Sequence, residues 1–410
     1  THRPLPNSML PDHTAERTEL RTDNATGQLR VTYATSYDPQ DVRAWSGTVY
    51  HMAKAMEAQG ISMEYMGKLA KNQLFVNKAI NKISRMTNFG DLFPVERTTR
   101  MAQHFADAIR EHLLHSRSDI VFSPSSLPIA LLKTKRPKVF YTDATFAGIL
   151  AKDPAFKTYP KKYIAEGHKL EQAALDNCDL AIYASKWAAQ TAMDYYKVDE
   201  RKVRVFPFGG NFSVPPPRAE VLKNIEDRKF EHCELLFVGV NWINKGGPKV
   251  MELARILHER GVPLKLHLVG CEPLVDALPP YATAHGFISK ATPAGRDLLK
   301  QLFANAHFLL LPTLADCLGL VMCEANSLGV PSMANDVGGV SEVVRPGING
   351  HLFPADAPAS DWADTIEKLF NDPKTYRQMA LDSRTEYETR LNWDVAGRSI
   401  KEALLGLLKK

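Results

Sequence analysis

Hydrophobic residues occur along this chain in short apolar runs that alternate with longer segments of helical spacing. The short runs are rich in Val, Ile, Tyr and Phe and end at loops, as buried strands do. Apolar residues spaced three and four apart predict helices between them. In the first half, strands are predicted at 29–36, 118–123, 137–142, 179–185 and 203–211, and helices at 48–59, 98–115 and 159–177. This alternation is typical of an open parallel sheet covered by helices.

A proline-rich segment divides the chain into two such halves. Residues 214–220, VPPPRAE, contain consecutive prolines, which cannot join a helix or an inner strand. Beyond this linker the alternation restarts, and strands are predicted at 234–240, 264–270, 282–289 and 307–313, with helices at 248–260, 297–304 and 317–329. We therefore expect a doubly wound, Rossmann-like domain at 29–213, a second one at 214–385, and a flexible leader at 1–28.

The segment 309–344 combines a strand, an acidic loop and a helix. The loop carries Asp316, and the backbone N–H groups of Leu318, Gly319 and Leu320 follow it at the expected start of the helix. Unpaired amides at a helix N-terminus, with a dipole equivalent to about half a positive charge, favour an anion such as a diphosphate. Because glycine has no side chain, Gly319 lets such a ligand approach the backbone closely.

A second acid, Glu324, follows Asp316 by eight residues, which is about two helical turns. Its neighbours are otherwise apolar. A carboxylate in this position can accept hydrogen bonds from both hydroxyls of a ribose, each worth about 1.5–3 kcal/mol. A phosphate site and a ribose site together predict a nucleotide.

Residues 312–344, PTLADCLGLVMCEANSLGVPSMANDVGGVSEVV, resemble the donor-binding signature of retaining GT-B glycosyltransferases of family 4, with its E-x7-E pattern. The resemblance implies an α/β GT-B fold, in which two doubly wound Rossmann-like domains face each other across a cleft. It implies that the domain at 29–213 binds the acceptor, that the domain at 214–385 binds the nucleotide sugar, and that a helix within 386–410 crosses back. Glu324 would then bind the ribose. Asp316, which replaces the longer Glu of the pattern, would lie near the transferred sugar.

The same resemblance implies roles for three further residues. In this family the glycine of the first loop, here Gly47, faces the cleft near the donor phosphates and the acceptor. Asp143, at the C-terminal end of a strand, corresponds to a His or Asp that touches the transferred sugar, and Gly209 resembles a glycine near the donor. The alternatives are a glycine needed only for a turn at Gly47 and a loop-capping role for Asp143. Ser46 is the expected cap of the helix at 48–59.

Lys245 is the expected cation at the donor diphosphate. It stands before two glycines and a helix start in GVNWINKGG, where a mobile ammonium can reach phosphate. The family usually offers an arginine as well, but Val240 and Asn244 occupy its expected positions. Either another basic residue, such as Lys290 or Arg296, replaces it, or activity is reduced.

The resemblance implies a reaction. A hexose would pass with retention from a nucleoside diphosphate sugar, such as a UDP- or GDP-sugar, to an acceptor hydroxyl of a glycan or lipid-linked saccharide. The family is generally metal-independent, and no protein base is named because the leaving phosphate is thought to take the acceptor proton. The alternatives are another GT-B enzyme, such as a sugar-nucleotide epimerase or a glucan phosphorylase, and a non-catalytic sugar-nucleotide-binding subunit.

The segment 69–86 has a basic face formed by Lys71, Lys78, Lys82 and Arg85, opposite an apolar face. Such a helix can lie on an anionic membrane, and many relatives glycosylate lipid-linked acceptors, so peripheral membrane contact is a hypothesis. A surface helix with a solvated lysine face is the simpler interpretation.

Composition adds limits to this picture. The 410 residues are 44% hydrophobic and 24% charged, as in an ordinary globular protein, and no run reaches the roughly 20 apolar residues of a spanning helix. The net charge of +5 is mild and gives no reason to expect nucleic acid as a partner. Five cysteines without a C-x-x-C pair favour a reducing, cytoplasmic setting.

Overall fold

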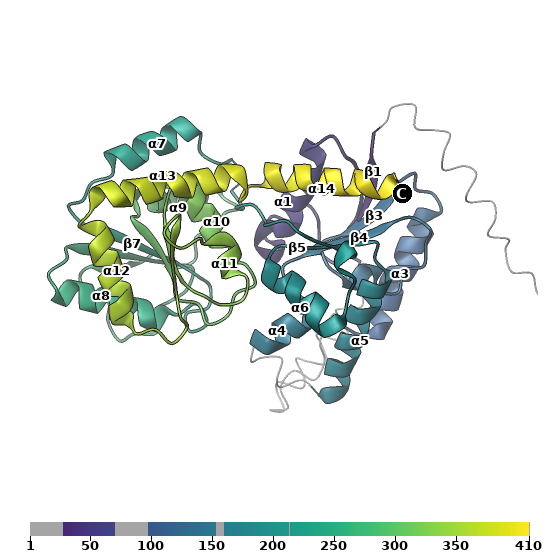
Figure 1. The fold of residues 1–410 in the computed structure, drawn as a ribbon, viewed down its shortest axis with the longest axis horizontal. Coiled ribbons are helices and arrows are strands. Elements are labelled where there is room, and N and C mark those ends of the chain that lie inside the picture. The colour runs from purple at the N-terminus through teal and green to yellow at the C-terminus, as the bar shows by residue number, and fades with distance from the viewer. Residues whose placement is uncertain (1–27, 70–96, 153–159, 213, 410) are drawn as a thin grey trace, which may run out of the picture.

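The computed structural model describes residues 28–69, 97–152, 160–212 and 214–409. The described chain forms two lobes side by side, each built on one parallel sheet with helices packed around it (Figure 1). The N-terminal lobe lies on the right of this view and the C-terminal lobe on the left. The predicted α/β class with two doubly wound sheets is confirmed.

In the N-terminal lobe the described strands form a six-stranded sheet in the order β2-β1-β3-β4-β5-β6, with parallel pairing throughout. Its strands are β1 (Arg30–Ala34), β2 (Ser62–Met66), β3 (Ile120–Ser123), β4 (Lys138–Thr142), β5 (Leu180–Tyr183) and β6 (Val203–Val205). Its helices are α1 (Thr48–Ala58), α3 (Thr99–Leu113), α4 (Phe146–Lys152), α5 (Lys161–Asn177) and α6 (Lys186–Tyr196). The direction in which the sheet grows reverses between β1 and β3.

In the C-terminal lobe the described strands form a second parallel sheet of six, in the order β12-β11-β10-β7-β8-β9. Its strands are β7 (Cys233–Val238), β8 (Leu264–Val269), β9 (Ala282–Ala284), β10 (Phe308–Leu311), β11 (Ser332–Asn335) and β12 (Gly350–Phe353). Its helices are α7 (Arg218–Asp227), α8 (Gly247–Glu259), α9 (Pro293–Asn305), α10 (Leu320–Ser327), α11 (Val340–Val343), α12 (Ala359–Phe370) and α13 (Pro373–Thr389). Here the direction reverses between β7 and β10.

The hydrophobic pattern explains these elements locally. Strands β3, β4, β5 and β10 are buried along their whole length, as expected for strands whose two faces are both covered by helices. Helix α3 buries Met101, Phe105 and Ile109, which are spaced four residues apart. Its N-terminus is capped by Thr98, whose side-chain oxygen accepts a hydrogen bond from the Met101 N–H at 3.3 Å.

Strands β2, β11 and β12 and helices α4, α12 and α13 were not predicted from the sequence. Where an element was predicted, the structure differs mainly at its ends. Helix α10 begins at Leu320, because Gly319 adopts a left-handed φ of 81° as its N-cap. Helix α9 begins at Pro293 rather than at Asp297. Helix α7 starts inside the predicted linker, directly after Pro217, since proline fits the residues just before a helix.

Two helices at the C-terminal end connect the lobes along one side (Figure 1). Helix α13 packs on α7 and α10 of the C-terminal lobe, and α14 (Trp393–Leu408, yellow) continues over α1 of the N-terminal lobe. The Lys401 Nζ atom donates a hydrogen bond to the backbone oxygen of Gln59 at 2.7 Å, and Ile400 and Leu404 are fully buried. The N-terminal lobe is therefore completed by residues from the far end of the chain.

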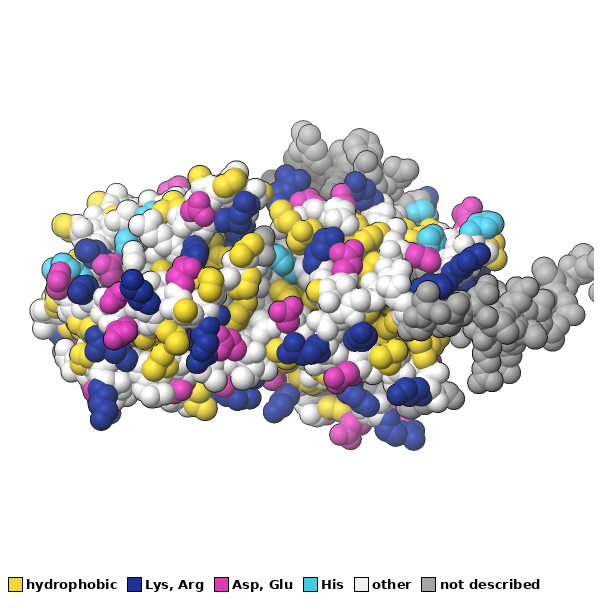
Figure 2. All heavy atoms as spheres, turned by 90° about the horizontal axis from the view of Figure 1, so that it is seen from above, with side chains coloured by type: hydrophobic (Ala, Val, Ile, Leu, Met, Phe, Trp, Pro, Cys, Tyr) yellow, Lys and Arg dark blue, Asp and Glu magenta, His cyan; other side chains and the backbone are white. Residues whose placement is uncertain are grey.

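The surface adds little direct information about partners. On the face shown in Figure 2, basic and acidic side chains are interspersed over both lobes, with hydrophobic side chains between them. Within the described ranges, no helix has the length and apolar character needed to cross a membrane. The predicted basic segment 69–86 lies outside the described residues except for Leu69, and so does the predicted leader at 1–28 except for Gln28.

Candidate active site

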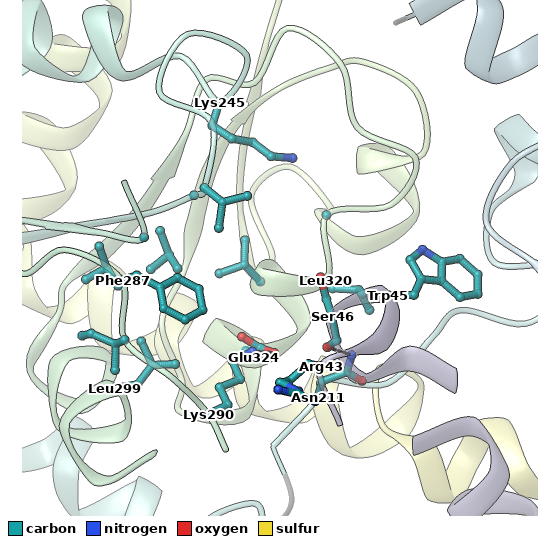
Figure 3. Close-up of a pocket in the computed structure, with 18 of the residues that line it drawn as sticks. Arg43, Trp45, Ser46, Asn211, Lys245, Phe287, Lys290, Leu299, Leu320 and Glu324 are labelled. Carbon is teal, nitrogen blue, oxygen red and sulfur yellow. Dashed lines mark hydrogen bonds and ion pairs between the residues drawn. The ribbon is translucent and has the colours of Figure 1, made fainter. Parts of the chain in front are cut away.

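A cleft of about 440 Å³ lies between the lobes and is lined by residues of both (Figure 3). In the C-terminal sheet the loops after β7 and β10, where the strand order reverses, reach this cleft, and in the N-terminal sheet the loop after β1 and Asp143 after β4 do so. This is the ligand-binding edge expected of open α/β sheets. The lining includes most of the predicted site residues: Asp143, Lys245, Asp316, Leu318, Gly319, Leu320 and Glu324. Residues from both lobes are thus brought together at one place.

The loop after β10 holds Asp316 in the cleft. It is supported by the turn at Gly338 and Gly339, whose backbone lies directly against it. A Cβ atom at Gly338, where φ is 56°, would lie 1.9 Å from the backbone oxygen of Asp316. The N–H of Gly339 donates a hydrogen bond to the same oxygen at 3.2 Å. The glycine pair is required here because a side chain at Gly338 would displace the acidic loop.

Lys245, from the loop after β7, forms an ion pair with Asp316. Its Nζ atom lies 2.5 Å from Asp316 Oδ2, and both side chains are largely buried. The close approach of the two loops depends on Gly246, because a Cβ there would lie 2.1 Å from the backbone oxygen of Pro312. The ion pair therefore joins the two loops at the reversal between β7 and β10 and fixes the Lys245 ammonium in the wall of the cleft.

The N-terminus of α10 points into the same region. The Leu318 N–H donates a hydrogen bond to Asp316 Oδ1 at 3.3 Å, so one of the three predicted amides is already bonded within the protein. An anion bound here would first meet the amides of Gly319 and Leu320. A side chain on Gly319 would meet Met322, since a Cβ would lie 2.0 Å from Met322 Cε.

Glu324 is buried, with 2% of its surface exposed, and lies on α10 facing the cleft (Figure 3). Its Oε1 atom is ion-paired with the Nζ of Lys290. Lys290 belongs to the loop between β9 and α9, and its ammonium lies 5.6 Å from the ring centroid of Phe212. Because an unpaired buried carboxylate is costly, the ion pair with Lys290 stabilises the charged form of Glu324.

Asp143 follows β4 and brings a second carboxyl toward Asp316 from the N-terminal lobe. Desolvation by burial, and then the negative charge of Asp316, raise the pKa of Asp143 from 3.8 to about 7. At neutral pH this group is therefore present in comparable amounts as acid and as carboxylate, so it can donate or accept a hydrogen bond.

The loop before α1 has an unusual backbone. Trp45, Ser46 and Gly47 have positive φ angles of 47°, 55° and 90° in succession. For Trp and Ser this conformation costs about 1–2 kcal/mol each, so surrounding contacts must hold it. The expectation that Ser46 caps α1 is wrong, because the helix starts after Gly47 with no side-chain cap.

Asn211 supplies those contacts. Its Nδ2 atom donates a hydrogen bond to the backbone oxygen of Ser46 at 2.8 Å, and its Oδ1 accepts one from Trp393 Nε1 at 2.8 Å. Trp393 is the first residue of α14 and stacks on Phe208, which also meets the edge of Trp45. The strained cleft loop is thus tied to the start of the connecting helix.

Gly47 and Gly209 lie next to the cleft rather than in its wall. A Cβ at Gly47 would lie 3.0 Å from the backbone oxygen of Val42. A Cβ at Gly209 would lie 2.3 Å from the backbone nitrogen of Trp393, so this glycine permits contact with α14. The donor contact predicted for Gly209 gains no support from this position.

Sequence reasoning missed several residues of the site. Asn211 belongs to a Gly-Gly-Asn motif in which the sequence predicted a role only for Gly209. No sequence pattern next to Trp45 predicts that it lines the cleft. His51, on α1, is close enough for Lys290 to act on it: burial, and then the charge of Lys290, lower the pKa of His51 to about 4. His51 is therefore uncharged at neutral pH.

Val240 and Asn244 occupy the two positions at which an arginine was expected. Val240 is 71% exposed, and the backbone of Asn244 is bonded to the loop after β10. The guanidinium of Arg296 donates to the backbone oxygens of Lys290 and Ala291 at 3.0 and 3.2 Å and does not line the cleft. Among the described residues that line it, the basic ones are Arg43, Lys245 and Lys290.

Family comparison agrees with this geometry. The family described as Glycosyltransferase Family 4 matches residues 47–211, which contain Asp143 and Asn211 of the cleft, whereas the cleft loop at 42–46 lies just before the match. The family described as Glycosyl transferases group 1 matches residues 221–385, which contain Lys245, Asp316 and Glu324. The two matches follow one another and together include both sheets of the described chain except β1.

Individual proteins similar to this chain agree with the family matches. The D-inositol 3-phosphate glycosyltransferase of Paenarthrobacter aurescens (strain TC1) is 26% identical over 77% of this chain and 81% of its own. The sucrose-phosphate synthase from Thermosynechococcus elongatus has a similar fold, with a TM-score of 0.67 and 16% identity over 93% of this chain and 99% of that one. Anabaena Alr3699/HepE, solved in complex with UDP, gives a TM-score of 0.61 and 14% identity over 92% and 100%. The chain is an enzyme that belongs to the GT-B glycosyltransferases of the group 1/family 4 type.

Proposed function

We propose that this glycosyltransferase moves a hexose, with retention of configuration, from a nucleoside diphosphate sugar to an acceptor hydroxyl. The observation that carries the proposal is Glu324, a buried carboxylate that faces the cleft about one helical turn from the N-terminal end of α10. A nucleotide matches this pairing, since its ribose hydroxyls can donate to the carboxylate while its phosphates lie at the helix N-terminus.

The chemistry follows from where charge develops. Cleavage of the bond between the sugar and the diphosphate places negative charge on the leaving group. Lys245 and the amides of Gly319 and Leu320 stabilise that charge more in the transition state than in the ground state, which is what lowers the barrier. The leaving phosphate takes the proton of the acceptor hydroxyl, so the proposal assigns no general base.

Two carboxyls are assigned to the transferred sugar. Asp316 and Asp143 approach this space from opposite lobes, and Asp143 is partly protonated at neutral pH. Hydrogen bonds from sugar hydroxyls to these groups would orient the sugar above the leaving phosphate. The ion pair with Lys245 keeps the Asp316 side chain next to the diphosphate position.

Similar proteins suggest the first donors and acceptors to test. Anabaena Alr3699/HepE was also solved with UDP-glucose, which favours a UDP-sugar as donor. The relatives named for D-inositol 3-phosphate make this cyclitol the first acceptor to try, beside glycans and lipid-linked saccharides.

The central test measures binding and turnover of UDP-, GDP- and ADP-sugars by the wild type and by Glu324→Gln. We expect one donor to bind and to release its nucleoside diphosphate, and Glu324→Gln to bind that donor about 10–100-fold more weakly, because hydrogen bonds to a charged group contribute about 1.5–3 kcal/mol. Glu220→Gln, on exposed α7, is the matched control. Equal donor binding by Glu324→Gln and wild type would contradict the ribose assignment. An inverted anomer in the product, read by NMR, would contradict retention.

Metal independence is a separate expectation. Because Lys245 and backbone amides supply the positive charge at the leaving diphosphate, we expect the rate of transfer to be unchanged after treatment with EDTA. Loss of the rate, with recovery on adding Mg²⁺ or Mn²⁺, would show that a cation supplies part of this charge.

Peripheral contact with the inner face of a membrane is also part of the proposal, and it rests on the basic pattern of 69–86. We expect the protein to sediment with anionic vesicles at low salt and to be released at high salt, since screening weakens such binding. Neutral vesicles are the control. Absence from the anionic pellet at low salt would remove this part of the proposal.

A further inference from the structure

Lys290 occupies the place where the proposed nucleotide must bind. Its ammonium is paired with Oε1 of Glu324, the carboxylate assigned to the ribose. A third of the Lys290 side chain is exposed, at 33%, whereas Glu324 is 2% exposed, so the lysine is the partner that can move. Ribose hydroxyls that bind both oxygens of Glu324 therefore compete with Lys290 for the Oε1 atom.

The contacts of Lys290 leave it free to move without disturbing its loop. The backbone oxygen of Lys290 is held by the Arg296 guanidinium at 3.0 Å, while the side chain reaches over the Phe212 ring into the cleft. The stem of a lysine has four rotatable carbons and carries a compact charge with three donors. The fixed backbone therefore acts as an anchor from which the ammonium can change partner.

A nucleoside diphosphate brings the new partner with it. Its first phosphate is bonded to the same ribose whose hydroxyls displace Lys290, so the displaced ammonium finds an anionic phosphate group next to its starting position. Val240 and Asn244 stand where a second phosphate-binding cation was expected, and Arg43, the remaining basic residue among the described ones that line the cleft, is paired with Asp41 at 2.9 Å. His51, which lies near Lys290, is uncharged at neutral pH and does not fill this role.

We propose that Lys290 is a mobile cation that neutralises Glu324 through this ion pair and moves onto the diphosphate when the nucleotide binds. This rests on the proposed function, because it takes Glu324 as the ribose ligand. The lysine would thereby replace the absent arginine. It would also weaken the binding of a nucleoside without phosphates, because such a ligand breaks the ion pair between Lys290 and Glu324 and contains no anionic group with which the ammonium could pair instead.

The test compares ligands that differ only in phosphate. Uridine with UDP, and guanosine with GDP, are titrated by calorimetry into the wild type and into Lys290→Met, Lys290→Arg and Lys300→Met. Lys300, on α9, pairs with Glu220 away from the cleft and is the matched control. Thermal unfolding of each variant shows whether it is folded.

For Lys290→Met we expect at least tenfold weaker binding of the diphosphate, and nucleoside binding that is unchanged or tighter. The preference for diphosphate over nucleoside should therefore fall at least tenfold in this variant and stay near the wild-type value in Lys290→Arg and Lys300→Met. Release of the nucleoside diphosphate from the donor should slow as well, because the cation acts on the leaving group.

Two results would overturn the proposal in distinguishable ways. If wild type binds a diphosphate but Lys290→Met loses affinity for diphosphate and nucleoside equally, Lys290 is only a fixed partner of Glu324. If the wild type binds no nucleotide at all, the nucleotide site itself is wrong, and the proposed function fails with the inference.

Discussion

Protonation of Asp143, in the cleft, makes the free energy of unfolding depend on pH. Its folded-state pKa of about 7 lies above the ordinary value of 3.8, so between these two values the folded state binds more protons than the unfolded state. The free energy of unfolding that this group contributes therefore falls as pH rises from about 4 to 7. The charged forms of Asp316 and Lys245 face the same space, and the former opposes ionisation of Asp143.

We expect Asp143→Asn to remove this dependence. Its free energy of unfolding, relative to the wild type, should increase by about 2–4 kcal/mol between pH 4 and pH 8, because the amide has no charge to bury. Urea denaturation at both values of pH measures the difference. Parallel pH profiles for variant and wild type would show that the carboxyl ionises as easily in the folded chain as in the unfolded one.

At the scale of residues, the sequence shows which side chains belong to the site better than it shows which of them form ion pairs with one another. Asp316, Glu324 and Lys245 could be found because strand ends, glycines and helix starts give a local frame in which their spacing has a meaning. That Lys245 pairs with Asp316, and Lys290 with Glu324, depends on loops that are far apart in the chain and come together only when the sheet forms.

At the scale of elements, the loop at Trp45–Gly47 depends on α14. Asn211 bonds the backbone of Ser46 on one side and the indole of Trp393 on the other, and this bridge keeps a costly backbone conformation in place. We therefore expect the position of the loop, and with it the geometry of the cleft, to respond to changes at Trp393.

Trp393→Phe tests this link, because it removes the Nε1 donor while a ring can still stack on Phe208. The variant should lose about 0.5–1.5 kcal/mol of stability, the usual net value of one hydrogen bond, and several-fold in kcat. Combined with Asn211→Asp, it should cause less than the sum of the two losses, since both changes break one bridge. Additive losses in kcat would contradict the link, and Tyr195→Phe, at an exposed ring, is the control.

Most elements could be predicted because their apolar periods are regular and their ends carry proline, glycine or a capping hydroxyl. The strained loop could not, since Trp and Ser rarely adopt positive φ and nothing adjacent in sequence stabilises it there. Helix α7 was also missed, because consecutive prolines indicate a linker yet equally suit the residues before a helix.

At the scale of the whole molecule, α14 stabilises a lobe to which it is not adjacent in sequence. Ile400 is fully buried, whereas Leu408, two turns further on the same helix, is 43% exposed. We expect Ile400→Ala to lower the free energy of unfolding by about 2–5 kcal/mol and Leu408→Ala to change it by less than about 0.5 kcal/mol. Urea denaturation followed by circular dichroism compares the two, and equal, small effects would mean that α14 does not support α1.

The packing of α14 on α1 also sets an order of events during synthesis. Domains generally begin to fold as they leave the ribosome, starting from the N-terminus. Here α1 emerges long before residues 393–408 exist, so the apolar side of α1 that will meet α14 remains uncovered while the whole C-terminal lobe is being made. The first lobe to appear is the last to be finished, and during that interval it offers a surface that chaperones can bind and that other nascent chains can join.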